Sequence, residues 1–92
     1  MLTLQTTTKF RKDYKRMKKQ NKDMSLLQDV LDTLLAEKPL EDDFNDHPLK
    51  GNYMGFRECH IQPDWLLIYA IHKEQLVLVA ARTGSHSELF NE

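Results

Sequence analysis

An unbroken apolar run at residues 65–71 constrains the fold of this chain more than any other segment. The run, Trp-Leu-Leu-Ile-Tyr-Ala-Ile, has the length and the aromatic and β-branched content of a buried strand. Pro63 and Asp64 come directly before it, and these two residue types favour a tight turn. Residues 53–61 are therefore expected to form the neighbouring strand of a hairpin. Alternation places Phe56, Glu58 and His60 on one face of that strand and Arg57, Cys59 and Ile61 on the other.

The rest of the chain predicts two helices and two further strands. Each helix has apolar residues at helical spacing and follows a side chain that can cap its first turn. The helices are expected from Thr7 or Thr8 to about residue 20 and from Asp23 or Ser25 to about residue 36. The strands are expected at residues 3–6 and 76–82. The connecting segments are a polar loop at residues 41–51, a turn at residues 72–75 and a short helical turn, capped by Ser85, at residues 85–90.

The order of these elements predicts an α+β fold. A strand, two helices and three strands imply a small antiparallel sheet with the helical hairpin packed on one face. The second helix has the broader apolar face, so we expect it to be the more deeply buried of the two. Ninety-two residues suffice for one core, and we expect a single domain over residues 1–92. The other face of the sheet, or its rim, is then free to carry a functional site.

Composition excludes several classes of protein. An apolar fraction of 40% and a charged fraction of 29% are typical of a soluble globular domain and not of a disordered chain. No apolar run approaches the roughly 18 residues of a membrane span, and residues 1–4 lack the features of a secretory signal. The single cysteine, Cys59, has no partner for an internal disulfide. We therefore expect a cytoplasmic protein without membrane contact.

Charge is unevenly distributed along the chain. Lysine and arginine number 13 against 14 aspartate and glutamate residues, yet the first predicted helix is strongly basic and the region after it is acidic. A basic helix face can bind a polyanion without raising the isoelectric point of the whole protein, although an ordinary solvated helix has the same pattern. The candidate RNA contacts are Lys9, Lys12, Lys15, Arg16 and Lys19 of this helix, together with Lys50 of the polar loop.

Five side chains suited to acid-base chemistry fall in loops or near the ends of the last predicted strands: His47, His60, Asp64, Arg82 and His86. Neighbouring antiparallel strands can bring them together. A ribonuclease that uses no metal needs a base for the ribose 2′-hydroxyl, an acid for the departing 5′-oxygen and a cation for the phosphorane. Histidine, carboxylate and arginine suit these roles at neutral pH. Trp65 or Phe90 would stack on a base.

Each of these residues also has a purely structural interpretation. Asp64 after Pro63 is a common turn former, Trp65 is a common core residue, and a histidine in a polar loop is usually a surface residue. Arg82 ends an apolar strand, where an inward charge needs a phosphate or carboxylate partner. A zinc site is a further alternative, although the spacing of its ligands matches no usual zinc pattern. Those ligands would be Cys59, His60, Asp64 and His86.

Short motifs surround these candidate positions. They are His47-Pro48-Leu49-Lys50-Gly51, Phe56-Arg57, Pro63-Asp64-Trp65 and Arg82-Thr83-Gly84-Ser85-His86 through Leu89-Phe90. Phe10, Lys12 and Asp13 in the first helix, and Lys22-Asp23-Met24 after it, belong to the same pattern. In this order and spacing the motifs resemble the YafQ family of bacterial toxins, within the RelE/ParE superfamily. The resemblance spans nearly the whole chain and implies the superfamily fold, a small antiparallel sheet with two helices against it.

The resemblance implies the toxin of a type II toxin-antitoxin pair, an endoribonuclease that cuts messenger RNA in the ribosomal A site. Cleavage in this class needs no metal ion or cofactor and leaves a 2′,3′-cyclic phosphate. The partners implied are the ribosome with its 16S RNA and a cognate antitoxin, which would form a hetero-oligomer with the toxin. The family's functional positions match His47, His60, Asp64, Arg82, His86 and Phe90. Among them, Arg82 would hold the scissile phosphate and Phe90 would position a base.

The roles in proton transfer are a hypothesis at this point. We expect His86 to act as the general acid and Asp64 or His60 to help deprotonate the 2′-hydroxyl. His47 would serve either in proton transfer or in charge stabilisation. Three histidines and a carboxylate in one site titrate together, so the sequence assigns no individual pKa.

Two other functions stay open. A ParE-like toxin would inhibit DNA gyrase by binding, without nuclease activity. A non-catalytic module on the same scaffold would bind RNA or a protein partner. The full set of histidines favours the ribonuclease, because a binding protein needs neither an acid nor a base.

Overall fold

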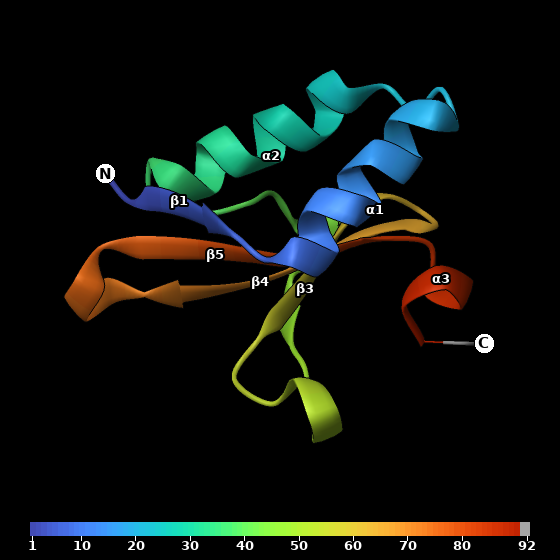
Figure 1. Cartoon of the computed structure of the whole chain (residues 1–92). Coiled ribbons are helices and arrows are strands. Elements are labelled where there is room, and N and C mark those ends of the chain that lie inside the picture. Colours follow the sequence, from blue (N-terminus) through green and yellow to red (C-terminus); the bar gives the residue numbers. More distant parts are fainter. Residues whose placement is uncertain (91–92) are drawn as a thin grey trace.

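A five-stranded sheet forms the centre of the computed structural model, which describes residues 1–90. In sheet order, the strands are β1 (Thr3–Thr6), β5 (Val77–Gly84), β4 (Trp65–His72), β3 (Arg57–Gln62) and β2 (His47–Pro48). The helices are α1 (Thr8–Lys19), α2 (Met24–Leu35) and α3 (His86–Phe90), with short 3₁₀ turns at Asp42–Phe44, Gly51–Tyr53 and Lys73–Gln75. Helices α1 and α2 lie over one side of the sheet, whereas α3 lies beyond the end of β5 toward the other side (Figure 1).

The α+β class and the two helices on one face of the sheet are confirmed. Strands β3, β4 and β5 form the predicted antiparallel meander, because tight turns join them. The prediction of a purely antiparallel sheet needs one correction: β1 pairs with β5 in parallel, with Thr3 opposite Val77 and Thr6 opposite Ala80. No hairpin turn joins β1 to β5, so local sequence does not determine their relative direction.

Two predictions between residues 41 and 61 are also corrected. The polar loop contains β2, a strand of two residues that pairs with β3 through His47 opposite Glu58. Strand β3 starts at Arg57 and not at residue 53, because residues 51–53 form a 3₁₀ turn and Gly55 takes a positive φ of 93°. A two-residue strand that includes proline has no periodicity from which sequence analysis can predict it.

The predicted caps of the two long helices are confirmed. Thr7 precedes α1, and its hydroxyl oxygen accepts the amide proton of Phe10 at 2.9 Å while the hydroxyl donates to the Ala81 carbonyl at 2.7 Å. Asp23 precedes α2 and accepts from the Ser25 amide at 3.1 Å. The contact to Ala81 also ties the start of α1 to the edge of β5.

Helix α2 buries the larger apolar face, as expected. Its buried residues are Leu27, Val30, Leu31 and Leu34. Helix α1 buries Phe10, Met17 and one carboxylate, Asp13. Within residues 1–90, no helix has both the length and the apolar character that crossing a membrane requires.

The sheet separates two apolar clusters, which explains the unbroken apolar run of β4. Trp65, Leu67 and Tyr69 face α1 and α2 and pack with apolar residues of both helices. Leu66 and Ile68 face the other side. Their neighbours there are Ala81, Leu89, Leu49, Tyr53, Phe56 and Phe90. Residues of β4 are buried whichever way they point, and its two ends lie beside the functional candidates described below.

Replacing Thr83 by valine is expected to destabilise the fold. The Thr83 hydroxyl accepts the Trp65 indole proton at 2.9 Å and donates to the Leu66 carbonyl at 2.7 Å, and all three residues are fully buried. Valine keeps the shape but leaves the indole N–H without an acceptor, which lowers the free energy of unfolding by about 1 to 3 kcal/mol. Chemical denaturation would measure the loss.

The matched control is Thr3→Val, because Thr3 lies exposed on the edge strand β1. This change should alter the free energy of unfolding by less than about 0.5 kcal/mol. An effect at Thr83 as small as the effect at Thr3 would contradict the assigned role of the Thr83 hydroxyl.

Candidate functional site

The predicted catalytic side chains converge on the face of the sheet opposite α1 and α2. Residue pairing places His47 beside Glu58, and Glu58 in line with Arg82 across β4. His60 lies two residues beyond Glu58 on the same face of β3, and His86 is the first residue of α3. The ring centroid of His60 is 6.3 Å from that of His47 and 5.7 Å from that of His86. The three imidazoles thus form a row with His60 in the centre.

Asp64, in the turn between β3 and β4, holds His86 in place. Its Oδ1 accepts the backbone N–H of His86 at 3.0 Å and lies 2.8 Å from Nδ1 of the same ring. These bonds, the backbone one first, lower the pKa of the Asp64 carboxyl, so the carboxylate persists at neutral pH. With Nδ1–H directed at the carboxylate, Nε2 is the ring atom left to face a substrate. His86 is therefore an acid-base group of fixed orientation.

His47 is held at both ring nitrogens. Nδ1 lies 2.7 Å from the carbonyl oxygen of Asn45, to which it donates, and Nε2 lies 2.8 Å from Oε2 of Glu58. The two contacts fix the orientation of the His47 ring and hold it against β3.

Glu58 is a site residue that the sequence analysis did not select. Its side chain is only 7% exposed, and within residues 1–90 its Oε1 is buried without a hydrogen-bond partner. A buried oxygen of this kind is costly, which makes Glu58 a candidate functional residue. The predicted alternation of the strand places Glu58 on the same face as His60, and this is the sequence signal that points to Glu58.

A second carboxylate fixes the short strand that carries His47. Asp46 accepts from the Tyr69 hydroxyl at 2.5 Å and from the Arg57 guanidinium at 3.2 Å. Burial, and then the contact with Asp46, raise the pKa of Tyr69, so its hydroxyl stays a neutral donor. The residue before His47 is thus anchored to β3 and β4, which explains how a two-residue strand keeps its position.

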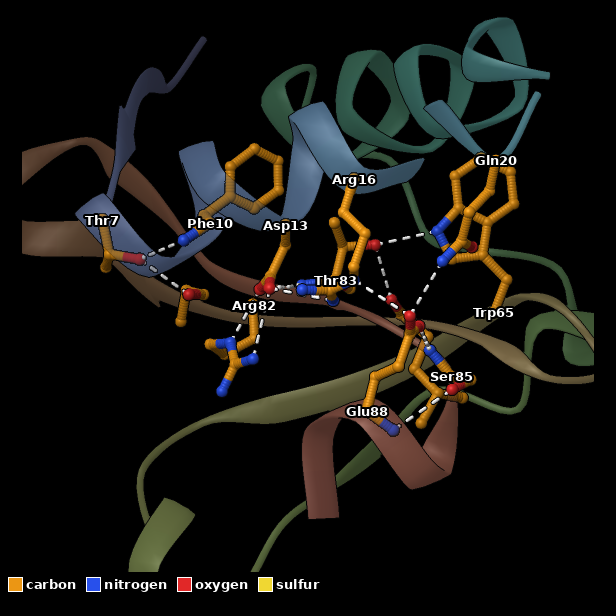
Figure 2. Close-up of polar contacts among 12 residues, drawn as sticks. Thr7, Phe10, Asp13, Arg16, Gln20, Trp65, Arg82, Thr83, Ser85 and Glu88 are labelled. Atoms are coloured by element: carbon orange, nitrogen blue, oxygen red, sulfur yellow. Dashed lines mark hydrogen bonds and ion pairs between the residues drawn. The ribbon is translucent and has the colours of Figure 1, made fainter. Parts of the chain in front are cut away.

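Arg82 has the carboxylate partner that its position requires. Its Nε and one terminal nitrogen donate to Asp13 of α1 at 2.7 and 3.2 Å (Figure 2). The bond to Asp13 is the main cause that raises the pKa of Arg82, so the guanidinium stays cationic. The side chain is still 17% exposed, and the second terminal nitrogen, which does not bond Asp13, has protons to offer an anion.

Phe90 lies beside the histidine row on α3. Its ring centroid is 6.5 Å from that of His86 and 5.8 Å from that of Tyr53, which it meets edge to face. Phe90 is half-buried, so part of the ring packs on the sheet and part stays accessible. A partly exposed aromatic ring next to an acid-base group is suited to stack on a nucleobase.

One of the predicted RNA contacts is corrected. Trp65 is 0% exposed and its indole donates to Thr83, so it is a core residue and offers no surface to a base. Arg16 contacts the carboxylates of Asp13 and Glu88 at 3.0 and 2.9 Å while 36% of its side chain stays exposed, so its contact with RNA stays a prediction. The remaining predicted contacts have exposed side chains: Lys9, Lys12, Lys15, Lys19 and Lys50.

The residues predicted for a zinc site do not come together as a set. Cys59 lies in the cluster that faces α1 and α2, on the opposite side of β3 from His60, and burial raises the pKa of its thiol to about 12. Asp64 is engaged by His86. Instead, Glu58, His60 and His86 each offer one ligand atom, and these atoms all lie within 4.8 Å of one another. This group has the nitrogen and oxygen ligands that suit a divalent metal ion.

Comparison with known proteins finds relatives over nearly the whole chain. The mRNA interferase toxin YafQ of Escherichia coli strain K12 is 39% identical over 82 residues, which cover 88% of this chain and 87% of the relative. A crystal structure of a metal-bound toxin from Helicobacter pylori is 50% identical, covers 98% of this chain and 100% of that chain, and has a TM-score of 0.92. A chain of the crystal structure of the E. coli DinJ-YafQ complex is 35% identical, with coverages of 98% and 99% and a TM-score of 0.88.

A family model matches residues 2–91, and its description is a bacterial toxin of type II toxin-antitoxin system, YafQ. The match spans the sheet, the helices and every residue of the candidate site. The resemblance drawn from the sequence motifs is thereby confirmed. The chain belongs to the YafQ family of bacterial type II toxin-antitoxin toxins.

Proposed function

We propose that this chain is the toxin of a type II toxin-antitoxin pair and that it inhibits translation by cleaving messenger RNA through metal-independent acid-base catalysis. The observation that carries the proposal is the row of three histidines with an ionised carboxylate at one end and Arg82 on the same face. Relatives support it, because the E. coli relative is named an mRNA interferase toxin and the YafQ of E. coli is crystallised in complex with DinJ. A cognate antitoxin is therefore part of the proposal.

The reaction requires three groups around one phosphate. A base takes the proton of the ribose 2′-hydroxyl, and that oxygen attacks the adjacent phosphorus to form the 2′,3′-cyclic phosphate. The bond from phosphorus to the 5′-oxygen breaks, and an acid gives this oxygen a proton. A cation stabilises the negative charge that develops on the phosphoryl oxygens between these events. All bonds form and break within the RNA, and the protein accepts one proton and supplies another.

We assign His86 as the acid and His60 as the base. Asp64 directs Nδ1 of His86, and its negative charge stabilises the imidazolium, which is the form that donates a proton. The two candidates for the base are Asp64 and His60. Because both contacts of Asp64 go to His86, we favour His60. The ring centroids of His60 and His86 are 5.7 Å apart, close enough for one phosphodiester to contact both.

The remaining residues of the face support these two rings. Glu58 offers an oxygen within 4.8 Å of a ligand nitrogen of His60, and its charge would stabilise the imidazolium that forms when His60 accepts the proton. His47 holds Glu58 in that place through Nε2. Arg82 is the cation for the phosphoryl oxygens, and Phe90 is the surface on which a neighbouring base stacks.

The exposed lysines suit a ribosome-bound substrate. Lys12, Lys15 and Lys19 recur at spacings of three and four residues, so they share one face of α1. Lys9 and Lys50 line a hollow at the end of α3, next to the proposed base position. Contacts from such residues to 16S ribosomal RNA in the A site would add affinity through release of counterions. Action on ribosomes would place the protein in the cytoplasm.

A ParE-like toxin that binds DNA gyrase without cleavage is less well supported. Binding alone has no need of a carboxylate that fixes one histidine nitrogen and leaves the other toward the open face. The same argument disfavours a non-catalytic module for RNA or protein binding. The relative from E. coli is named for interference with mRNA, which also supports the nuclease.

A divalent metal ion would compete with this chemistry. The relative from H. pylori is metal-bound in its crystal structure, and among residues 1–90 of this chain Glu58, His60 and His86 are close enough together to hold a metal ion. A ring nitrogen that coordinates a metal cannot also carry the transferred proton. We therefore expect cleavage to proceed in the presence of EDTA.

Replacing His86 by alanine is expected to slow the cleavage of ribosome-bound messenger RNA by about 10²- to 10⁴-fold, the usual contribution of a general acid. Single-turnover kinetics with saturating toxin would measure the loss. The fold should persist, because the His86 ring lies at the surface, with 40% of the side chain exposed.

His72→Ala is the matched control, since His72 is an exposed histidine at the turn between β4 and β5. This variant should keep the wild-type rate. A fully active His86→Ala protein would exclude His86 as the acid. A wild-type protein that arrests growth without cutting RNA would instead favour gyrase or another bound target.

Asp64→Asn is expected to shift the pH profile of cleavage. The lowered pKa of Asp64 keeps its carboxylate charged at every pH above its ordinary value of about 4, so the wild type has a negative charge beside His86 throughout the neutral range. Asparagine removes that charge and makes the imidazolium less stable. The alkaline limb of the rate profile should therefore move to lower pH. Single-turnover rates between about pH 5 and pH 9 would test this, and an unmoved alkaline limb would count against the pairing.

A further inference from the structure

We infer that Asp13 of α1 is a positioning residue, which fixes the Arg82 guanidinium so that the terminal nitrogen that does not bond Asp13 meets the scissile phosphate. The inference rests on the proposed ribonuclease function and extends the site to a helix on the opposite side of the sheet from the histidine row. Three observations carry it: the burial of Asp13, its place at the edge of β5, and its two-point contact with Arg82.

Asp13 is a buried carboxylate on an otherwise apolar helix face. It is 2% exposed, and the other buried residues of α1 belong to the core. A charge in such a place is costly unless it is compensated. Figure 2 shows the compensation, in which Arg82, the backbone N–H of Thr83 and Arg16 all point at the same carboxylate. The Thr83 amide donates at 3.2 Å, and the nearest terminal nitrogen of Arg16 lies at 3.0 Å.

Asp13 lies beside the part of β5 that does not pair with β1. The pairing of β1 with β5 ends at Thr6 opposite Ala80. Beyond that point Thr7 donates its hydroxyl proton to the Ala81 carbonyl, and Asp13 accepts the N–H of Thr83. The carboxylate thus replaces a strand carbonyl as the acceptor for this amide. It fixes the backbone of the residue next to Arg82.

The same oxygen fixes the side chain of Arg82. Oδ2 of Asp13 accepts both the Thr83 amide and Nε of Arg82, and Oδ1 accepts one terminal nitrogen of Arg82. A carboxylate that binds two nitrogens of a planar guanidinium sets the orientation of the whole group. After the bond to Asp13, a side-chain hydrogen bond with Tyr53 also raises the pKa of Arg82, and Tyr53 belongs to the cluster on the face of the sheet opposite α1 and α2.

Arg16 extends the network from Asp13 to α3. Its Nε donates to Oε2 of Glu88 at 2.9 Å. Oε1 of Glu88 accepts the Ser85 amide at 2.9 Å, and the Ser85 hydroxyl accepts the Glu88 amide at 3.2 Å, which confirms the predicted cap at Ser85. A helix of five residues is not stable alone. One helix, α1, therefore anchors both Arg82 and the short helix that carries the proposed acid.

Gly84 allows these groups to approach the strand. It takes a φ of 156°, and a Cβ added there would lie 3.0 Å from a terminal nitrogen of Arg16 and 3.1 Å from a carboxylate oxygen of Glu88. A Cβ at this position would force the ends of the Arg16 and Glu88 side chains to move by a few tenths of an ångström. The close approach is thus part of the arrangement around Asp13.

The kinetic test compares Asp13→Asn, Arg82→Ala and the double variant in single-turnover cleavage. Asparagine keeps an oxygen for the Thr83 amide but removes the charge that holds Arg82. The rate should fall about 10- to 100-fold, as expected for a misplaced catalytic group, while affinity for the ribosome stays unchanged. If Asp13 acts through Arg82, the double variant should be no slower than Arg82→Ala alone. Losses that multiply in the double variant would overturn the inference.

Two controls separate positioning from loss of fold. Asp29→Asn, at an exposed aspartate of α2, should keep the wild-type rate. Thermal unfolding would reveal any variant that no longer folds. If Asp13→Asn does not fold, Asp13→Glu takes its place in the comparison with Arg82→Ala. Glutamate keeps the charge but displaces it by one methylene group.

A measurement without substrate separates this inference from the proposed function. Relaxation of the Arg82 Nε–H group by NMR should give an order parameter near that of rigid backbone, about 0.85, in the wild type and below about 0.6 in Asp13→Asn. Equal order in both proteins would overturn the role of Asp13 even if the wild type cleaves RNA. If the variant loses order and the wild type does not cleave RNA, the positioning of Arg82 by Asp13 would be supported and the proposed ribonuclease function would be refuted.

Discussion

The buried carboxylate of Asp13 is the contact on which the rest of the arrangement depends. It lies where α1 takes the place of β1 as the neighbour of β5, and it compensates the charges of Arg82 and Arg16. Removing it would leave Arg82 without its carboxylate partner and Arg16 with Glu88 alone, which is more costly than the loss of one neutral hydrogen bond. The same carboxylate therefore determines the position of α1, the edge of β5 and the orientation of the Arg82 side chain.

The site itself is assembled from parts that are anchored separately. Asp13 of α1 binds Arg82, and Asp64 in the β3–β4 turn binds His86. His47 follows Asp46, which accepts hydrogen bonds from β3 and β4. Arg82, His86 and His47 each have a partner of opposite charge or a polar bond, so the domain carries several ionisable groups on one face. The buried Oε1 of Glu58 is the exception, and it lies among the groups proposed to act on RNA.

Sequence analysis predicted those features that rest on local pattern. The apolar run of β4, the helix periodicity and the cap at Thr7 involve residues close in the chain, and all are present in the structure. The parallel direction of β1 depends on a strand at the other end of the chain, and no local signal encodes it. Trp65 suits a core and a stacking surface equally, and only its bond to Thr83 and its burial decide between them. The need of Arg82 for an anion was predictable, but its partner lies 69 residues away.

If proton transfer by side chains cleaves RNA at its 2′-hydroxyl, the ends of the cleaved RNA reveal the mechanism. Ribosome-bound messenger RNA would be treated with the wild-type protein in EDTA, and the new 3′ end would be identified by mass spectrometry. We expect a 2′,3′-cyclic phosphate, and no cut when the nucleotide at the scissile bond is 2′-deoxy. A 3′-hydroxyl end, cleavage of the deoxy substrate, or activity only after a metal ion is added would contradict it.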